Sequence, residues 1–382
     1  MSETGMTAPT RGMEHEITGN GPLLDGRGRL REPGWARSLA LDYDRGAIRA
    51  PSFRIKEWDY YCIVAGDIAL AFTVADNSYM GLLSASVLDL ERGGEVTETV
   101  MTALPMGRTG LPPSSVSGVT AASAKDLSMR FEASDGTRRL RVSWPSFGAR
   151  SKDRAEALFG LPSGASATAT ARGAVGLEAE IELRERPGRE SMVIATPFKG
   201  HPRHFYYNQK INCQDATGKV RVGARGIGLE HGKAFGVLDW GRGVWPWRND
   251  WLWGSASGLA RVSGSASPLS FGFNIGYGFG DTSAASENMV FVDGRAHKIG
   301  RLGIERDDRD FLKPWKVRSE DGRLELTLSP RLDRSAATDF LVLASIQHQV
   351  FGTWSGRVEL EDGRIVEIEA LPGFCEKVSN RW

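Results

Sequence analysis

Asp239 lies between two apolar residues in the segment Val237-Leu-Asp-Trp-Gly-Arg-Gly-Val-Trp-Pro-Trp. A carboxyl group that is withdrawn from water has a raised pKa and can give up its proton near neutral pH. Such an acid can protonate an alkene, and the cation that results is stabilised by the faces of neighbouring indole rings. We therefore interpret Asp239 as a candidate catalytic acid.

Arg242 follows Asp239 by three positions and offers a different interpretation of the same carboxyl group. A guanidinium group beside a carboxylate stabilises the charged form and lowers its pKa. The two residues would then be a structural clamp without a catalytic role. The residues alone leave both alternatives open.

Five of the eleven tryptophans lie within the fourteen residues from Trp240 to Trp253. Alternate side chains of an extended segment project from the same face, so the odd-numbered positions of this run share one face. Pro246 cannot donate a ladder hydrogen bond, and we expect a kink that interrupts this face there. The indole rings either fill a barrel interior or form the wall of a ligand chamber. On the second interpretation the candidate ligand-binding residues are Trp240, Arg242, Trp245, Trp247 and Trp251.

Further polar side chains occur in apolar surroundings outside the tryptophan run. The segment Lys199-Gly-His-Pro-Arg-His-Phe-Tyr-Tyr-Asn-Gln-Lys210 places His204, Tyr206 and Asn208 on one strand face. Tyr207 and His204 are candidate orienting groups for a ligand. The remaining candidate ligand-binding residues are Asn208, Asn274 and Glu287.

Known cofactor and metal motifs are missing from the sequence. His201 and His204 are spaced like metal ligands, but Pro202 lies between them and the spacing indicates no third ligand. No G-x-x-x-x-G-K-[ST] segment and no G-x-S-x-G segment occurs. We therefore expect neither a metal nor a cofactor.

The charge balance and the apolar stretches limit the partners that the sequence indicates. Lys and Arg together number 48 and Asp and Glu 47, for a formal charge of +1, and neither sign forms a long block. This composition disfavours a nucleic acid or an anionic membrane as a partner held by charge. Apolar stretches fall well short of the ~20 residues that span a bilayer, and three distant cysteines indicate no disulfide framework. We expect a cytoplasmic protein without an integral membrane segment.

The elements that must position these residues are strands. From Tyr60 onward, short runs of β-branched and aromatic residues alternate with turn signals. Four Asp-Gly pairs predict hairpins because Asp-Gly adopts positive φ at low cost, and near the last of them Val358 and Leu360 are expected to face the core. A meander with one polar face must curl to protect its edges. We predict an all-β fold of two closed antiparallel meanders in tandem, preceded by a mobile N-terminal arm over residues 1–27.

Several motifs carry a family resemblance over nearly the whole chain. They are Lys56-Glu-Trp-Asp-Tyr-Tyr, the tryptophan-rich centre, Ser286-Glu-Asn, Val292-Asp-Gly and Leu371-Pro-Gly-Phe-Cys-Glu. With them the chain resembles the bacterial family known as domain of unknown function 2804. That family has no established activity, so the resemblance implies an architecture more than a function.

More distantly, the order of elements is similar to that of the carotenoid hydratase and AttH-like proteins. The resemblance implies two tandem lipocalin-like, or calycin-like, antiparallel β-barrels over residues 28–245 and 246–382. It also implies that Asp239 occupies the position of an Asp associated with hydration of a double bond, and that Gly373-Phe-Cys-Glu376 lies in the strand closing the second barrel. The chain departs from that pattern because Trp240 stands where those proteins carry a His, and their upstream His-x-Trp has no clear counterpart.

Our leading hypothesis is a protein that binds a hydrophobic or amphipathic small molecule and acts on it as a cofactor-free hydratase, isomerase or cyclase. A non-catalytic ligand-binding protein is the first alternative, with Asp239 and Arg242 as a structural pair. A carbohydrate-active protein is the second, with Asp239 and Asp250 flanking the glycosidic bond. The opposite parity of Trp245 and Asp250 in an extended run weakens this second alternative. The oligomeric state is not predicted.

Overall fold

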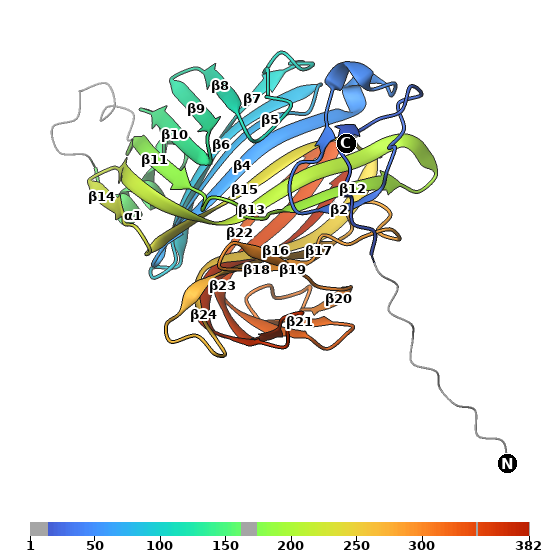
Figure 1. The fold of residues 1–382 in the computed structure, drawn as a ribbon. Coiled ribbons are helices and arrows are strands. Elements are labelled where there is room, and N and C mark those ends of the chain that lie inside the picture. Colours follow the sequence, from blue (N-terminus) through green and yellow to red (C-terminus); the bar gives the residue numbers. More distant parts are fainter. Residues whose placement is uncertain (1–13, 162–173, 341–342, 382) are drawn as a thin grey trace.

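The computed structural model describes residues 14–161, 174–340 and 343–381, and within these ranges the protein is almost entirely β-sheet. Two large antiparallel sheets follow one another along the chain and lie against each other (Figure 1). Each sheet curls nearly into a barrel. The predicted all-β fold of two tandem antiparallel barrels is therefore confirmed.

The first sheet holds most of the strands from the N-terminal two thirds of the chain. It consists of β2 (Gly34–Ala36), β4 (Ile55–Ala65), β5 (Ile68–Asp76), β6 (Met80–Asp89), β7 (Gly94–Ala103), β8 (Gly118–Ala124), β9 (Leu127–Ser134), β10 (Thr137–Trp144), β11 (Leu177–Arg184), β12 (Met192–Phe198), β13 (His201–Val222), β14 (Arg225–Leu229) and β15 (Ala234–Val244). The main path runs β7-β6-β5-β4-β15-β13-β11-β10-β9-β8. The pairing of β15 with β4 brings the two ends of the meander together, and the sheet stays open between β7 and β8.

The second sheet repeats this circular order with fewer strands. It consists of β16 (Arg248–Val262), β17 (Leu269–Tyr277), β18 (Met289–Val292), β19 (Arg295–Lys298), β20 (Leu302–Glu305), β21 (Trp315–Ser319), β22 (Leu324–Phe340), β23 (Leu343–Glu359) and β24 (Ile365–Arg381). Here β16 pairs with β24, and the sheet stays open between β19 and β20. The first sheet thus ends at Val244 and the second begins at Arg248. The division into domains at residue 245 stays a prediction.

The elements outside these sheets are short. They are the parallel pair β1 (Gly21–Pro22) and β3 (Leu41–Asp42), the 3-10 turns η1 (Arg45–Ala47), η2 (Ser52–Arg54) and η3 (Ala149–Ser151), and the helix α1 (Lys152–Phe159). Of the predicted N-terminal arm, residues 1–13 lie outside the described residues. The part from residue 14 onward packs against the body, where Ile17 and Leu23 are buried. No helix in the described part of the chain is long and apolar enough to cross a membrane.

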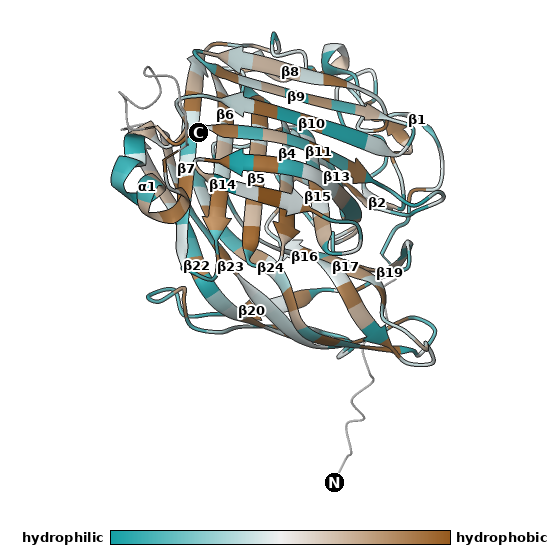
Figure 2. Ribbon diagram, turned by 90° about the vertical axis from the view of Figure 1, so that its left-hand side faces the viewer, coloured by the Kyte–Doolittle hydropathy of each residue, from teal (hydrophilic) through white to brown (hydrophobic). Residues whose placement is uncertain are grey.

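The alternation of side chains along the strands produces the cores. Every second residue is buried along β10 and β11 and along β9 as far as Phe131, and Figure 2 shows the matching change of colour along these ribbons. Val358 and Leu360 are buried, as the alternation before the last Asp-Gly pair predicts. The Asp135-Gly136 pair joins β9 to β10 with both residues at positive φ, which confirms that hairpin.

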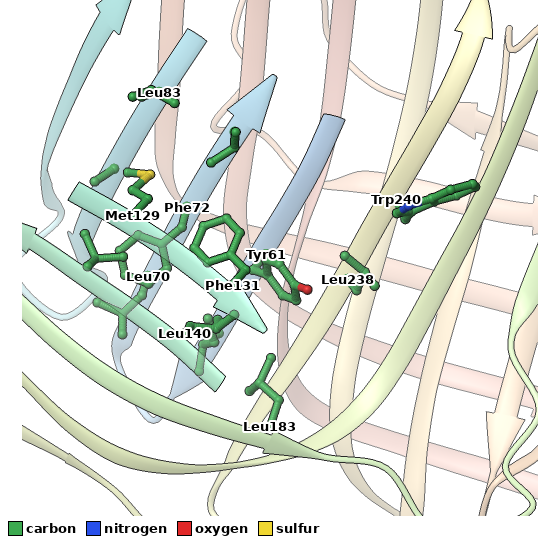
Figure 3. Close-up of a cluster of buried hydrophobic side chains, with 14 of the residues drawn as sticks. Tyr61, Leu70, Phe72, Leu83, Met129, Phe131, Leu140, Leu183, Leu238 and Trp240 are labelled. Atoms are coloured by element: carbon green, nitrogen blue, oxygen red, sulfur yellow. The ribbon is translucent and has the colours of Figure 1, made fainter. Parts of the chain in front are cut away.

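In the described part of the chain, apolar side chains form three cores. Inside the first sheet, Met129 and Phe131 of β9 lie against residues of β4, β5 and β6 (Figure 3), and the Phe131 ring meets Tyr61 edge-on at 5.1 Å. Inside the second sheet, Phe273 of β17 meets Trp354 of β23 at 5.2 Å. The third core, which we call the inter-sheet layer, lies between the two sheets. Its aromatic members include Tyr60, Tyr206, Trp245, Trp253, Phe279, Phe351 and Phe374.

Strand β13 connects the first sheet to the second. Its first half pairs with β12 and β15, and its second half pairs with β11 and β14. At the bulge between them, the Asn212 amide donates to Ser255 Oγ at 2.8 Å and to the Phe273 carbonyl oxygen at 2.9 Å on the second sheet. Side chains of β13 that point away from the interior of the first sheet therefore enter the inter-sheet layer.

Candidate functional site

Asp239 points into the inter-sheet layer and is paired with a lysine. Its Oδ2 atom lies 2.9 Å from Nζ of Lys210, and its Oδ1 atom accepts a hydrogen bond of 2.6 Å from the Asn208 amide. Both partners come from β13, which pairs with β15 so that Lys210 is opposite Asp239. Both carboxylate oxygens of Asp239 therefore act as acceptors.

Arg242 does not pair with Asp239, which rules out the alternative of a clamp between these two residues. Residues three apart on a strand face opposite sides, and Arg242 points into the first sheet instead. There its guanidinium group donates to Asp59 Oδ1 at 3.0 Å and to the carbonyl oxygens of Trp58, Gly241 and Pro112 at 2.7–2.8 Å. Four hydrogen bonds hold the charge, although Nε has no partner among the described residues.

Glu287 lies in the same inter-sheet layer, in the segment between β17 and β18, and its carboxyl group is unmatched. The residue is 3% exposed, and neither carboxyl oxygen has a hydrogen-bond partner among the described residues. Burial, together with the negative charge of Asp239, raises the pKa of Glu287 to about 7, against the lowering effects of Lys210, Asn274 and Lys298. Near neutral pH this carboxyl group is therefore a buried acid that can carry a proton.

Glu376 of β24 is a second buried carboxyl group with a raised pKa, again because of burial. In contrast to Glu287, both of its oxygens accept hydrogen bonds. Trp251 Nε1 donates to Oε1 at 2.9 Å, and the amides of Gln347 and Gln349 donate to Oε2 at 3.3 and 3.1 Å. We call Lys210, Asp239, Glu287 and Glu376 the acid cluster, since the charges of Lys210 and Asp239 act on both glutamates.

Aromatic rings surround the acid cluster. The Lys210 ammonium group lies 3.8 Å from the centre of the Trp253 ring and 5.5 Å from that of Phe279, which are cation-π distances. Phe279 stacks on Tyr206 at 5.1 Å, and Trp245 packs between Tyr206 and Trp251. These rings therefore stabilise the buried charge of Lys210 and form an aromatic wall beside the acid cluster.

Small residues on β15 make room for these rings. A Cβ atom at Gly241 would lie 2.1 Å from the indole of Trp58, which packs across the strand at that point. Any larger residue would push the Trp58 ring out of its place, where it stacks on Tyr206 at 6.2 Å. The glycine at position 241 thus permits the close approach of the Trp58 ring.

The structure divides the predicted site residues into separate groups. Those in the inter-sheet layer are Asp239, Asn208, Trp245, Trp251, Asn274 and Glu287. Three others point into the first sheet, namely Trp240, Tyr207 and Arg242, where the hydroxyl of Tyr207 donates to the Leu41 carbonyl oxygen. His204 is half-buried at the start of β13, in a different pocket.

Trp247 does not lie with the aromatic rings of the inter-sheet layer. Pro246 separates β15 from β16, and Trp247 is 40% exposed, with the Arg54 guanidinium group 5.4 Å from its ring centre. The expected interruption of the odd-numbered face at Pro246 therefore occurs. Beyond it the parity holds again, since Trp251 and Trp253 both reach the inter-sheet layer.

The sequence contained signals for the two cluster members that were not among the candidates. Lys210 has the parity of His204, Tyr206 and Asn208, so extending that strand face by two residues would have included it. For Glu376 the only signal is the resemblance to the hydratase-like proteins, which implies that it lies in the strand closing the second barrel. Asp250, which the carbohydrate hypothesis requires beside Asp239, is exposed to solvent, whereas Asp239 is buried.

The acid cluster is closed in this conformation. Its four members are between 1% and 7% exposed, so a ligand must displace side chains of the layer to reach them. Asn274 couples the cluster to the segment that carries Glu287, because its amide accepts from Trp253 Nε1 at 2.6 Å and donates to the main-chain oxygen of Glu287 at 2.9 Å.

Among the residues that the structure covers, no group of three or more His, Cys, Asp and Glu side chains could hold a metal ion.

Comparison with known proteins identifies the family. The model described as "Domain of unknown function (DUF2804)" matches residues 14–382, and the chain belongs to this family. This confirms the resemblance inferred from the sequence motifs. Comparison with curated proteins found no match.

Two solved structures are similar to this one at low sequence identity. An AttH-like protein from Nitrosomonas europaea is 12% identical, with a TM-score of 0.45, over 94% of this chain and 98% of that chain. Kievitone hydratase from Nectria haematococca is 14% identical, with a TM-score of 0.43, over 86% of this chain and 88% of that chain. At this distance neither protein's activity is transferred to this chain.

Proposed function

We propose that the protein binds a hydrophobic or amphipathic small molecule in the inter-sheet layer and acts on it by acid catalysis, with Glu287 as the acid. The observation that supports this proposal is the buried carboxyl group of Glu287, whose oxygens have no hydrogen-bond donor among the described residues and whose pKa is raised to about 7. A buried polar group without partners costs stability. A functional role gives a reason for a fold to keep it.

The proposed step is proton transfer to a carbon-carbon double bond. The Glu287 carboxyl group gives its proton to one alkene carbon, and the positive charge that forms on the other carbon lies against the rings of Trp253, Phe279 and Tyr206. Water then adds to the cation in a hydratase, or the cation loses a different proton in an isomerase. In either case the proton released returns to the Glu287 carboxylate, which restores the acid.

Asp239 has a positioning role in this proposal, which revises its assignment as the acid. Both of its oxygens accept hydrogen bonds, from Lys210 and from Asn208, so it has no free oxygen to direct at a ligand. Its negative charge raises the pKa of Glu287. Asp239 therefore keeps Glu287 protonated and holds Lys210 against the aromatic wall.

The test begins with the molecule that the protein retains. An organic extract of the purified protein is analysed by mass spectrometry, and the compound found there is incubated with fresh protein in deuterated water. We expect deuterium to enter a carbon of the compound with the wild-type protein and the exposed-residue control Asp250→Asn, and not with Glu287→Gln. Deuterium incorporation that is unchanged in Glu287→Gln would reject the acid role of this residue.

A non-catalytic ligand-binding protein is the second candidate. The burial of the acid cluster favours it, because a ligand that binds without displacing the surrounding side chains would not reach the acid. On this alternative the extracted compound binds to the wild-type protein and to Glu287→Gln, and neither protein introduces deuterium. The carbohydrate-active alternative has no support from the position of Asp250. A cytoplasmic location and the lack of a nucleic-acid partner stay predictions from the sequence.

A further inference from the structure

A pocket of about 430 Å³ lies on the surface of the first sheet, away from the acid cluster, and four arginines line it. Its volume falls in the range of small-molecule sites. The arginines come from three separate segments: Arg27 and Arg29 from the turn before β2, Arg49 from the segment before η2, and Arg203 from the start of β13. His201 and His204 complete the wall.

The local structure holds these segments together. Asp25 Oδ1 accepts hydrogen bonds of 2.9 Å from the backbone N–H groups of Arg27 and Arg29, which fixes the turn. Gly28 has a φ of +75°, and a Cβ atom there would lie 2.7 Å from Cβ of Arg49, so the turn can press against Arg49 only with glycine at this position. The guanidinium group of Arg203 donates to the Arg49 carbonyl oxygen at 3.3 Å.

The pocket carries positive charge that the protein does not neutralise. Arg29 pairs with Asp25 at 2.9 Å. Within the described ranges, no carboxylate lies within 4.0 Å of the guanidinium groups of Arg27, Arg49 or Arg203. The whole chain has a formal charge of only +1, so this concentration of positive charge is local. A concave site lined by charge of one sign attracts ligands of the opposite sign.

The two histidines contribute ring nitrogens to this wall. Their rings stack at 4.7 Å with an angle of 11°. Burial, with help from the neighbouring charges of His201 and Arg54, lowers the pKa of His204 to about 4, so its ring is neutral at neutral pH. The buried Nδ1 atom of His204 has no hydrogen-bond partner among the described residues.

We infer that this pocket binds a phosphate group. A phosphate ester offers two negative charges and three acceptor oxygens, which match several guanidinium groups better than a carboxylate does. The phosphate can belong to a soluble metabolite or to the head group of a lipid, because the recognised chemistry is the same. The inference is independent of the proposed acid catalysis, since no member of the acid cluster lines the pocket.

The test uses phenyl phosphate as the probe and benzoate as its carboxylate counterpart, with binding measured by titration calorimetry at about 0.15 M salt. We expect phenyl phosphate to bind the wild-type protein in a one-to-one ratio and benzoate to bind more weakly. Arg49→Gln and Arg203→Gln should each weaken phenyl phosphate binding about tenfold. Arg221→Gln, at an exposed arginine of the same strand β13 outside the pocket, should leave it unchanged.

Vesicles separate the two sources of phosphate. Vesicles of phosphatidylcholine are compared with vesicles that also contain phosphatidic acid, whose head group is a phosphate monoester. Binding of phenyl phosphate alone supports a soluble ligand, and binding to the phosphatidic acid vesicles, lost in Arg49→Gln, supports a lipid head group. The inference is overturned if neither probe binds, if benzoate binds as tightly as phenyl phosphate, or if Arg221→Gln weakens binding as much as Arg49→Gln.

Discussion

The two faces of strand β15 bury polar groups that differ in how completely they are hydrogen-bonded. On the face that points into the first sheet, Arg242 makes four hydrogen bonds to Asp59 and to three carbonyl oxygens. On the face that points to the second sheet, Asp239 and Lys210 lie in one cluster with Glu287, whose carboxyl oxygens have no partner in the described structure. A matched buried charge holds a structure together, whereas an unmatched acid costs stability and is kept for another reason.

Breaking the matched network should have the largest effect on stability. Arg242→Met leaves the Asp59 carboxylate buried without its cation, and we expect it to lower the free energy of unfolding by about 3–5 kcal/mol. Urea denaturation followed by circular dichroism measures this loss. The double variant Asp59→Leu with Arg242→Met removes both charges and should recover part of it. A loss below about 1 kcal/mol in the single variant would contradict the structural role.

The unpaired carboxyl group of Glu287 should make the free energy of unfolding depend on pH. The folded-state pKa of Glu287, about 7, lies above its ordinary value of 4.5, so the folded protein holds this proton more tightly than the unfolded chain. Its contribution is therefore fully present below pH 4.5 and is lost as the pH rises toward 7. The total change is roughly 3 kcal/mol.

Glu287→Gln isolates this contribution because glutamine has no proton to lose. The difference in unfolding free energy between the wild type and Glu287→Gln should shift in favour of the variant as the pH rises from 4.5 to 7. Unfolding curves of both proteins across this range measure it. A difference that stays constant with pH would show that Glu287 is not a perturbed acid.

Removing the negative charge of Asp239 should have a smaller effect, on the pKa of Glu287. Asp239 raises the pKa of Glu287, so Asp239→Asn should move the midpoint of the Glu287 titration downward, by about one pH unit. The uncompensated Lys210 ammonium group acts in the same direction. The infrared absorption of the protonated carboxyl group, followed against pH, reports the midpoint. Asp250→Asn, at an exposed position, should leave it in place.

The smallest effect is expected at Trp247, which lies just beyond the end of β15. Its ring is 40% exposed, so Trp247→Ala should change the free energy of unfolding by about 0.5 kcal/mol or less. Trp245→Ala removes a ring that is 1% exposed and should cost about 3–5 kcal/mol. Similar losses for the two variants would contradict the division of the tryptophan-rich run at Pro246.

Period-two alternation predicted the strands and also the parity of Trp251 and Trp253, because these depend only on local backbone geometry. The same rule, applied to Asp239 and Arg242, would have placed them on opposite faces and excluded the clamp. The pKa of Glu287 could not be predicted in this way. It depends first on burial between the two sheets and then on Lys210 and Asp239, which other strands bring to Glu287 from distant positions in the chain. Glu376 likewise joins the cluster through pairing of β24 with β16.

The closing contact of each sheet has a consequence for how the chain reaches its native state. Strand β4 (Ile55–Ala65) can pair with β15 (Ala234–Val244) only after the intervening strands have been synthesised. The pairing of β16 with β24 likewise requires synthesis of the strands between them. Pairings between residues so distant in sequence are slow to form, since a long loop must close first. A nascent chain that has passed β4 but not β15 therefore exposes an unpaired strand edge, where chaperones or other nascent chains can bind.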